Sequence, residues 1–209
     1  MTRPDLMALA EAERTDLLIF LQTLTNTQWT AQSLCSQWTV RDVALHLVSY
    51  EELSKPVLVG VFVRGGLRVS RVNDVALRRY QELDSDGILE LLSRNLRPAG
   101  LTSGFRGGIA LTDGTIHHQD IRRALGLPRT IPPGRLVPVL NFAAGAPTLP
   151  AKKNVKGLTL TATDVDWSRG AGPEVKGPGE ALLMAVSGRP TALDELHGPG
   201  LETLQGRVG

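Results

Sequence analysis

The chain has one cysteine, Cys35, among its 209 residues. A single cysteine excludes an internal disulfide and a structural zinc site built from several cysteines. Aromatic residues make up only 4% of the chain, too few for a surface on which nucleic-acid bases stack. We therefore expect a protein of a reducing compartment that does not bind nucleic acid through stacked bases.

An excess of charge of one sign is also lacking, because 23 Lys and Arg residues face 21 Asp and Glu residues, for a net charge of +2. This balance leaves no strong field to attract a nucleic acid. The longest apolar run, residues 56–63, is far shorter than the roughly 20 residues that span a membrane. Glu11, Glu13 and Arg14 interrupt any signal-peptide core near the N-terminus. We expect a soluble cytoplasmic protein with neither a nucleic-acid nor a membrane partner.

Helical periodicity runs through the first part of the chain. Residues 6–24 carry apolar side chains along one stripe, which predicts an amphipathic helix. Thr39 precedes an aspartate by three residues, a spacing that caps the start of a second helix. Further helices are predicted over residues 74–83 and 109–125, with others between them. Residues 1–135 are therefore expected to form a helical bundle.

The last third of the chain has a different composition. Residues 136–154 are rich in proline and are predicted to be a connector. Residues 158–163 alternate between apolar and β-branched types, which favours a strand, and residues 174–176 are predicted to return beside it. Residues 179–187 then indicate a helix. Residues 155–209 are therefore expected to form a small α/β module.

Three residues of the predicted bundle could hold a metal ion. His46 lies in an apolar stretch, where an unpartnered imidazole would be costly. Asp113 and His117 are four residues apart, so their side chains leave one helix face about 5–6 Å apart. Helix bundles build metal sites from ligands on facing helices. Three protein ligands with one open position are typical of catalytic zinc. The alternatives are a solvated acid–histidine pair and an ordinary core histidine.

The residues after His117 allow further interpretations. Asp120 could accept a hydrogen bond from the second ring nitrogen of His117; an exposed acid is the alternative. Arg122 and Arg123 could bind a cofactor or a carboxylate-bearing substrate, although basic residues at a helix C-terminus need no ligand to explain them. His118 lies about 100° around the helix from His117 and is expected to face solvent or the bundle seam.

Cys35 and His197 are weaker candidates. Cys35 could be a nucleophile, but a single thiol is more commonly an inert packing residue. His197 precedes a Gly-Pro pair and is expected at the surface. The glycines Gly104, Gly107 and Gly108 match neither a dinucleotide-binding fingerprint nor a phosphate-binding loop, and no Gly-x-Ser-x-Gly hydrolase motif is present.

Two segments resemble one known family. Residues 38–47, WTVRDVALHL, look like the signature of the mycothiol-dependent maleylpyruvate isomerase family. Residues 113–126, DGTIHHQDIRRALG, resemble its second metal segment. Carried over by position, the family's ligands are His46, Asp113 and His117; the first of the adjacent histidines matches because an Asp-Ile pair follows it by three residues. The acid departs from the family, whose best-known isomerases have the longer Glu, so the shorter arm could hold an ion more weakly.

The resemblance extends to residues 157–167 and 172–178, which are similar to the C-terminal part of actinobacterial members of the family. It implies a mainly α fold, in which a DinB-like four-helix bundle precedes the small α/β module. It also implies a divalent metal, with Zn²⁺ the expected ion, and mycothiol as cosubstrate. Arg122 and Arg123 would then anchor the substrate.

The chemistry that the resemblance implies has two outcomes. A metal-activated thiolate would attack an electrophile; an activated cis alkene would be isomerised by addition, rotation and elimination, whereas a substrate with a leaving group would undergo S-transfer. Two other functions stay open. One is a non-catalytic metal-binding bundle, with His118 as a possible fourth ligand. The other is a metal-dependent hydrolase, for which Asp120 is the one candidate base.

Overall fold

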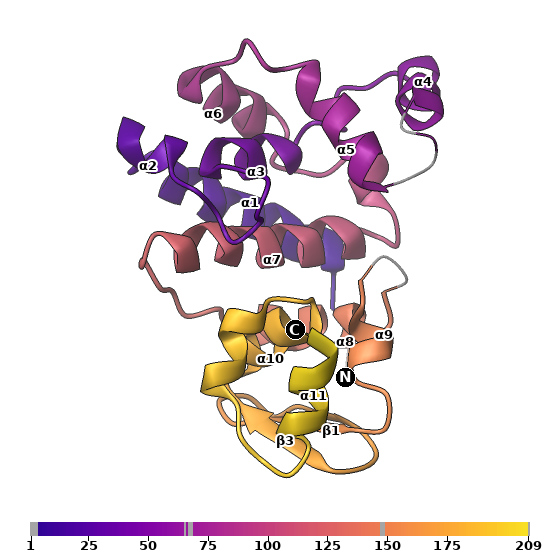
Figure 1. Cartoon of the computed structure of the whole chain (residues 1–209). Coiled ribbons are helices and arrows are strands. Elements are labelled where there is room, and N and C mark those ends of the chain that lie inside the picture. Colours follow the sequence, from indigo (N-terminus) through magenta and orange to yellow (C-terminus); the bar gives the residue numbers. More distant parts are fainter. Residues whose placement is uncertain (1–3, 65, 67–68, 147–148, 209) are drawn as a thin grey trace. The chain divides into compact units, whose positions relative to one another are not determined.

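Helices account for most of the computed structural model, which describes residues 4–64, 66, 69–146 and 149–208 (Figure 1). The chain divides into two compact units, Met1–Pro128 and Arg129–Gly209. The first unit is helical, and the second contains a three-stranded sheet. This confirms the predicted mainly α fold with a small C-terminal α/β module. In the described part of the chain, no helix combines the length and apolarity needed to cross a membrane.

The N-terminal unit is built on two long helices, α1 and α7, which pack along one another. The shorter helix α3 packs against α2, α5, α6 and α7. The helices of this unit are α1 (Leu6–Leu21), α2 (Asn26–Thr30), α3 (Val40–His46), α4 (Lys55–Arg64), α5 (Val69–Arg78), α6 (Ser85–Arg94), the 3₁₀ helix η1 (Leu101–Ser103) and α7 (Gly108–Ala124).

The start of α3 is set by the capping box that the sequence predicts. The Asp42 backbone N–H donates to the Thr39 hydroxyl, and the Thr39 N–H donates to the Asp42 carboxylate at 3.0 Å. These two bonds satisfy donors that the first helical turn leaves free. Because the start is fixed, His46 falls in the last turn of α3.

Helix α5 differs from its predicted range, since it covers Val69–Arg78 and not residues 74–83. Arg41 donates hydrogen bonds to the carbonyl oxygens of Gln81, at 2.8 Å, and Leu83, at 2.6 Å. Past Arg78 the N–H groups of Arg79 and Tyr80 donate to carbonyls three residues back, so the chain continues in turns and the α-helical ladder ends. The contact with Arg41, which lies far away in the sequence, holds this segment after α5 and is not visible in its local periodicity.

Helix α7 is preceded by a position that only glycine suits. Gly107 has φ of 91°, and a Cβ added there would lie 2.8 Å from the Cα of Met7 in α1. The lack of a side chain at Gly107 permits both the left-handed backbone and the close approach. This contact fixes the N-terminal end of α7 against α1.

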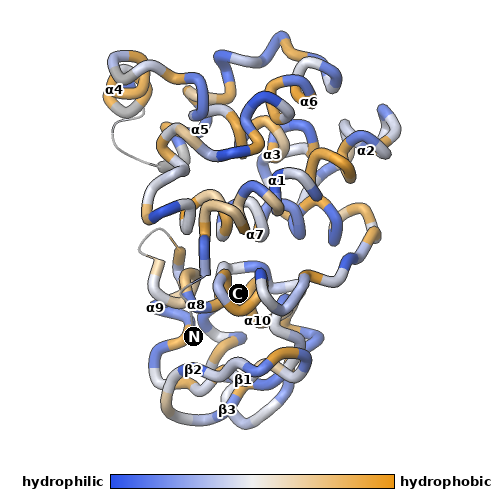
Figure 2. Tube along the Cα trace, turned by 180° about the vertical axis from the view of Figure 1, so that it is seen from behind, coloured by the Kyte–Doolittle hydropathy of each residue, from blue (hydrophilic) through white to orange (hydrophobic). Residues whose placement is uncertain are grey.

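Apolar side chains from α1, α2, α3, α6 and α7 form the main core of the N-terminal unit. Figure 2 shows hydrophobic and hydrophilic positions interleaved along these helices, as expected where one face is buried. The core positions include Leu17, Leu21, Trp29, Val40, Val43, Leu45, Ile88, Leu92 and Ile121. Helices α3 and α7 are thus held against one shared core.

A buried ion pair also stabilises this unit. Arg14 of α1 donates to the Glu51 carboxylate at 2.6 Å, and both side chains are almost fully buried. Glu51 also accepts hydrogen bonds from the backbone N–H groups of Ala99 and Gly100, at 2.8 Å each, and from the Thr102 hydroxyl. The pair joins α1, the segment after α3 and η1.

The C-terminal unit contains a small mixed sheet of strand order β2-β1-β3. Strand β1 (Thr159–Ala162) is antiparallel to β2 (Ser168–Gly170) and parallel to β3 (Glu174–Gly177). The predicted strands β1 and β3 are confirmed. Strand β2 lies where no strand was predicted, because its residues are all exposed and carry no alternation. The buried helix α10 (Gly179–Val186) packs on β1 and β3, and η2 (Pro190–Glu195) and α11 (Leu201–Val208) follow.

The proline-rich segment is helical where we expected a connector. Helix α8 (Pro133–Ala143) and helix α9 (Ala151–Asn154) lie in or across residues 136–154, and the second compact unit begins at Arg129. Pro133, just before this segment, and Pro150 stand at helix starts, where the missing N–H costs nothing, whereas Pro138 lies inside α8. The proline content of this segment therefore does not mark it as a connector.

Candidate metal centre

The structure brings together the three residues predicted to ligate a metal. The Nε2 atom of His46 lies 3.5 Å from Oδ2 of Asp113, and Nε2 of His117 lies 3.6 Å from Oδ1 of the same carboxylate. The two imidazole rings are 5.1 Å apart and nearly perpendicular. One donor atom from each residue lies within 4.8 Å of the other two. The aspartate, although shorter than the family's glutamate, thus reaches both histidines.

Helix geometry and packing explain this convergence. Asp113 and His117 are one turn apart on α7, and His46 stands at the end of α3, which packs on α7. The Trp38 ring lies against both imidazoles, with centroid distances of 4.7 Å to His46 and 5.9 Å to His117. The Tyr50 ring meets His46 edge-on at 6.3 Å. Aromatic rings therefore limit how the two imidazoles can turn.

The distances fit a shared cation better than hydrogen bonds. At 3.5 and 3.6 Å, the histidine–aspartate separations are too long for good hydrogen bonds. Ligands about 2.0–2.1 Å from a tetrahedral zinc ion stand about 3.3 Å from one another. Two imidazoles and one carboxylate are also a donor set that suits zinc and related divalent ions.

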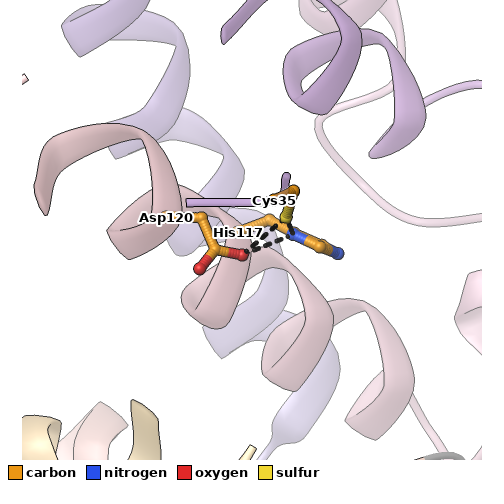
Figure 3. Close-up of side chains that lie close together, drawn as sticks. All are labelled: Cys35, His117 and Asp120. Carbon is orange, nitrogen blue, oxygen red and sulfur yellow. Dashed lines mark hydrogen bonds and ion pairs between the residues drawn. The ribbon is translucent and has the colours of Figure 1, made fainter. Parts of the chain in front are cut away.

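A second carboxylate fixes the orientation of His117. Asp120 is fully buried, and its Oδ2 lies 2.9 Å from Nδ1 of His117. This is the hydrogen bond that the sequence suggested, and the exposed-acid alternative is wrong. In the neutral imidazole the proton then sits on Nδ1, so the lone pair of Nε2 faces Asp113 and His46. Figure 3 shows the second ring nitrogen of His117 pointing away from Asp120.

Charge around His117 changes its pKa. Burial disfavours the charged ring, but the neighbouring Asp113 carboxylate and the hydrogen bonds with Asp120 and Cys35 outweigh it and raise the pKa of His117 to about 10. The surroundings thus favour a positive charge at this ring. A cation that binds at Nε2 has to displace a proton, so its affinity should fall as the pH falls.

The sequence did not predict that Cys35 lies beside His117 and Asp120. Its Sγ lies 3.2 Å from Oδ2 of Asp120 and 3.6 Å from Nδ1 of His117 (Figure 3). The backbone N–H of Leu34 donates to the Asp120 carbonyl at 3.2 Å, which holds this loop against α7. The partners are 82 and 85 residues away in the chain, and no local pattern links them.

His118 faces the seam between α1 and α7, one of its two expected positions. It is fully buried, with Nδ1 2.9 Å from Oε1 of Glu13. Its Nε2 accepts a hydrogen bond from Nε of Arg122 at 2.9 Å. Both ring nitrogens therefore bond to residues outside the candidate metal centre. His197 is exposed, as expected, and its backbone pairs with Lys176.

Arg122 and Arg123 do not lie on the face of α7 that carries His117. The Arg122 guanidinium lies 3.8 Å above the Phe20 ring and also donates to the Leu127 carbonyl at 3.1 Å. Arg122 and Arg123 follow His117 by five and six residues, which places them about 140° and 240° around the helix from it. Arg123 is half-buried in the last turn of α7. Their predicted role in binding a cofactor or substrate stays a prediction.

Comparison with known protein families gives a match over most of the N-terminal unit. Residues 10–112 match the family described as Mycothiol maleylpyruvate isomerase N-terminal domain. This range includes His46 and ends directly before Asp113. No curated protein matches the sequence.

Two solved structures share the fold. A crystal structure of the mycothiol-dependent maleylpyruvate isomerase is 14% identical, covers 95% of this chain and 96% of its own, and has a TM-score of 0.57. A histidine-to-alanine mutant of that enzyme is 15% identical over the same shares of both chains, with a TM-score of 0.54. At this identity, the likeness shows a common architecture over both units.

Proposed function

The chain belongs, through residues 10–112, to the mycothiol maleylpyruvate isomerase family, and on this premise we propose that it is a metal-dependent enzyme that activates mycothiol for attack on an electrophile. The observation that carries the proposal is the convergence of His46, Asp113 and His117. Three protein ligands leave one position for a cosubstrate. The similar solved enzyme is named as mycothiol-dependent, which supports the choice of thiol.

The net charge of a divalent ion held by these three side chains would favour a thiolate as the fourth ligand. A bound Zn²⁺ would lower the pKa of a coordinating thiol, so that the thiolate is present at neutral pH. His46 and His117 would bind through neutral imidazoles and contribute no charge, whereas Asp113 contributes one negative charge. A divalent ion in this set keeps a net positive charge, which favours an anionic fourth partner over a neutral one.

The exposed fractions of the three side chains indicate the side from which a small molecule would approach the metal centre. The Asp113 side chain is 36% exposed, whereas those of His46 and His117 are 9% and 11% exposed. The two imidazoles are covered by Trp38 and by the helices that carry them. We therefore expect the thiol and its electrophile to reach the centre past Asp113.

The structure gives less support to the two alternative functions. A closed structural site would need a fourth protein ligand, and both ring nitrogens of the candidate, His118, bond to other residues. A hydrolase would need a general base beside the ion. Asp120, the candidate base, is fully buried and bonds to the opposite edge of His117. Isomerisation and S-transfer share the thiolate attack, and the proposal covers both.

A cobalt titration tests the thiol proposal. The protein carrying Cys35→Ser and loaded with Co²⁺ should develop a thiolate-to-cobalt charge-transfer band when mycothiol is added. The substitution removes the protein's one thiol, so the band must come from the added thiol. Further replacement of His46 by Ala should abolish the band. If cobalt is bound and the spectrum stays flat at saturating mycothiol, the proposed thiol activation is wrong.

A further inference from the structure

A second set of potential metal ligands lies on the other edge of the His117 ring. Cys35 Sγ, His117 Nδ1 and Asp120 Oδ2 all lie within 4.8 Å of one another. The separations are 3.6 Å from sulfur to nitrogen, 3.2 Å from sulfur to oxygen and 2.9 Å from nitrogen to oxygen. In Figure 3 the thiol and the carboxylate both point at the same ring nitrogen. The first set uses the opposite nitrogen, Nε2.

We propose that Cys35, His117 and Asp120 form a second cation position, which takes thiophilic divalent ions such as Cd²⁺ and excludes an ion from the His46–Asp113–His117 set when it is filled. The second position does not depend on the proposed function. Only the exclusion rests on the metal centre proposed above.

The donor chemistry selects the class of ion. Thiolate, imidazole and carboxylate together suit zinc and softer divalent ions, and the sulfur favours the softer ones. Around an ion with bonds of about 2.0 Å to nitrogen or oxygen and 2.3 Å to sulfur, the ligands stand roughly 3.3–3.6 Å apart. For a zinc-sized ion the three ligand atoms would therefore need to move apart by a few tenths of an ångström, mainly at Asp120, and for the larger Cd²⁺ by more.

The loop that carries Cys35 is held in place before any ion binds. The Leu34 N–H donates to the Asp120 carbonyl, and the Cys35 N–H donates to the Ser33 hydroxyl at 3.1 Å. The Gln32 amide donates to the Cys35 carbonyl at 2.8 Å. These bonds fix the sulfur beside α7, so binding a cation costs little further ordering of the chain.

The two cation positions exclude each other because they use the two nitrogens of one imidazole ring, that of His117. When Nδ1 of the metal-free protein binds a cation, the thiol proton and the Nδ1 proton are released to solvent, and the ring keeps the proton on Nε2. The protonated Nε2 then has no lone pair for an ion beside His46 and Asp113. A thiophilic ion at Cys35 should therefore inhibit thiol activation without touching either of these residues.

Cadmium titration tests the second position. Metal-free protein titrated with CdCl₂, without added thiol, should show thiolate-to-cadmium charge-transfer absorption that saturates at one ion per chain. Replacing both His46 and Asp113 by Ala should leave the absorption in place. Asp120→Asn and His117→Ala should each weaken cadmium binding about tenfold or more, with circular dichroism used to check folding. Cys35→Ser, which is nearly isosteric, should abolish the absorption.

Three outcomes would overturn the inference. Unchanged cadmium affinity in both Asp120→Asn and His117→Ala would mean that the thiol alone captures the ion. No absorption from the folded wild-type protein at saturating cadmium would remove the position altogether. In protein loaded with Zn²⁺, cadmium should release zinc more readily from the wild type than from Cys35→Ser; equal release would refute the exclusion. Because none of these assays contains mycothiol, their outcome is independent of the cobalt titration above.

Discussion

Replacing His117 by Ala should abolish stoichiometric metal binding. His117 contributes Nε2 to the centre, and loss of an outer partner of a metal-ligating histidine already costs roughly 10–100-fold in affinity. We expect removal of the ligand itself to cost more than about a hundredfold. Elemental analysis after dialysis against buffer with a low zinc concentration measures the loss directly.

His197→Ala is the matched control for this change. His197 is exposed and pairs with Lys176 through its backbone, far from α3 and α7 in the chain, so its replacement should leave the metal content unchanged. Equal metal content in the two variants would contradict the site. The His117 variant should also keep its helical circular dichroism, because the apolar core that holds α3 and α7 does not include this ring.

Replacing Glu51 by Ala should destabilise the protein by about 3–5 kcal/mol, because it leaves the Arg14 guanidinium buried without its carboxylate. It also leaves the N–H groups of Ala99 and Gly100 without their acceptor. Urea unfolding of the full chain, followed by circular dichroism, measures the change. Glu52→Ala is the control, since this exposed neighbour makes a 3.5 Å surface pair with Arg94 and accepts an exposed hydrogen bond from Asn95 at 3.0 Å, and its replacement should cost less than about 1 kcal/mol.

The Arg14–Glu51 ion pair should make the free energy of unfolding depend on pH in the acid range. Burial would raise the pKa of Glu51, but the charge of Arg14 and the hydrogen bonds from Thr102, Arg14 and Gly100 lower it below its ordinary value of 4.5. The unfolded chain therefore binds this proton more readily than the folded one. The stabilisation is fully present above about pH 5 and is lost as the pH falls through 4.5 toward the folded pKa. In Glu51→Ala, the unfolding free energy should change less over this range; an unchanged slope would contradict the pairing.

The predictable parts of the molecule are those set by neighbours in sequence. The capping box at Thr39 and Asp42 and the one-turn spacing of Asp113 and His117 are local, so a pattern of a few residues determines them. The hydrogen bond from His117 to Asp120 is local in the same way. That His46 belongs with Asp113 and His117 depends on how α3 packs on α7, and in advance it rested on the general rule for metal sites in helix bundles and on the family resemblance.

The parts that the sequence did not predict depend on distant contacts. Cys35 reaches His117 and Asp120 because a backbone hydrogen bond holds its loop to α7, and His118 finds its partner 105 residues away in Glu13. A helical projection shows which way a side chain points but not what lies opposite. The proline-rich segment illustrates another limit. Proline ends a helix but also starts one, and composition alone does not separate the two.

Anomalous diffraction from zinc-soaked crystals tests the central claim most directly, because it places the ion itself. We predict one peak about 2.0–2.2 Å from Nε2 of His46, Nε2 of His117 and a carboxylate oxygen of Asp113. A peak bonded to other residues, or none near His46 in protein that binds zinc in solution, would contradict the account.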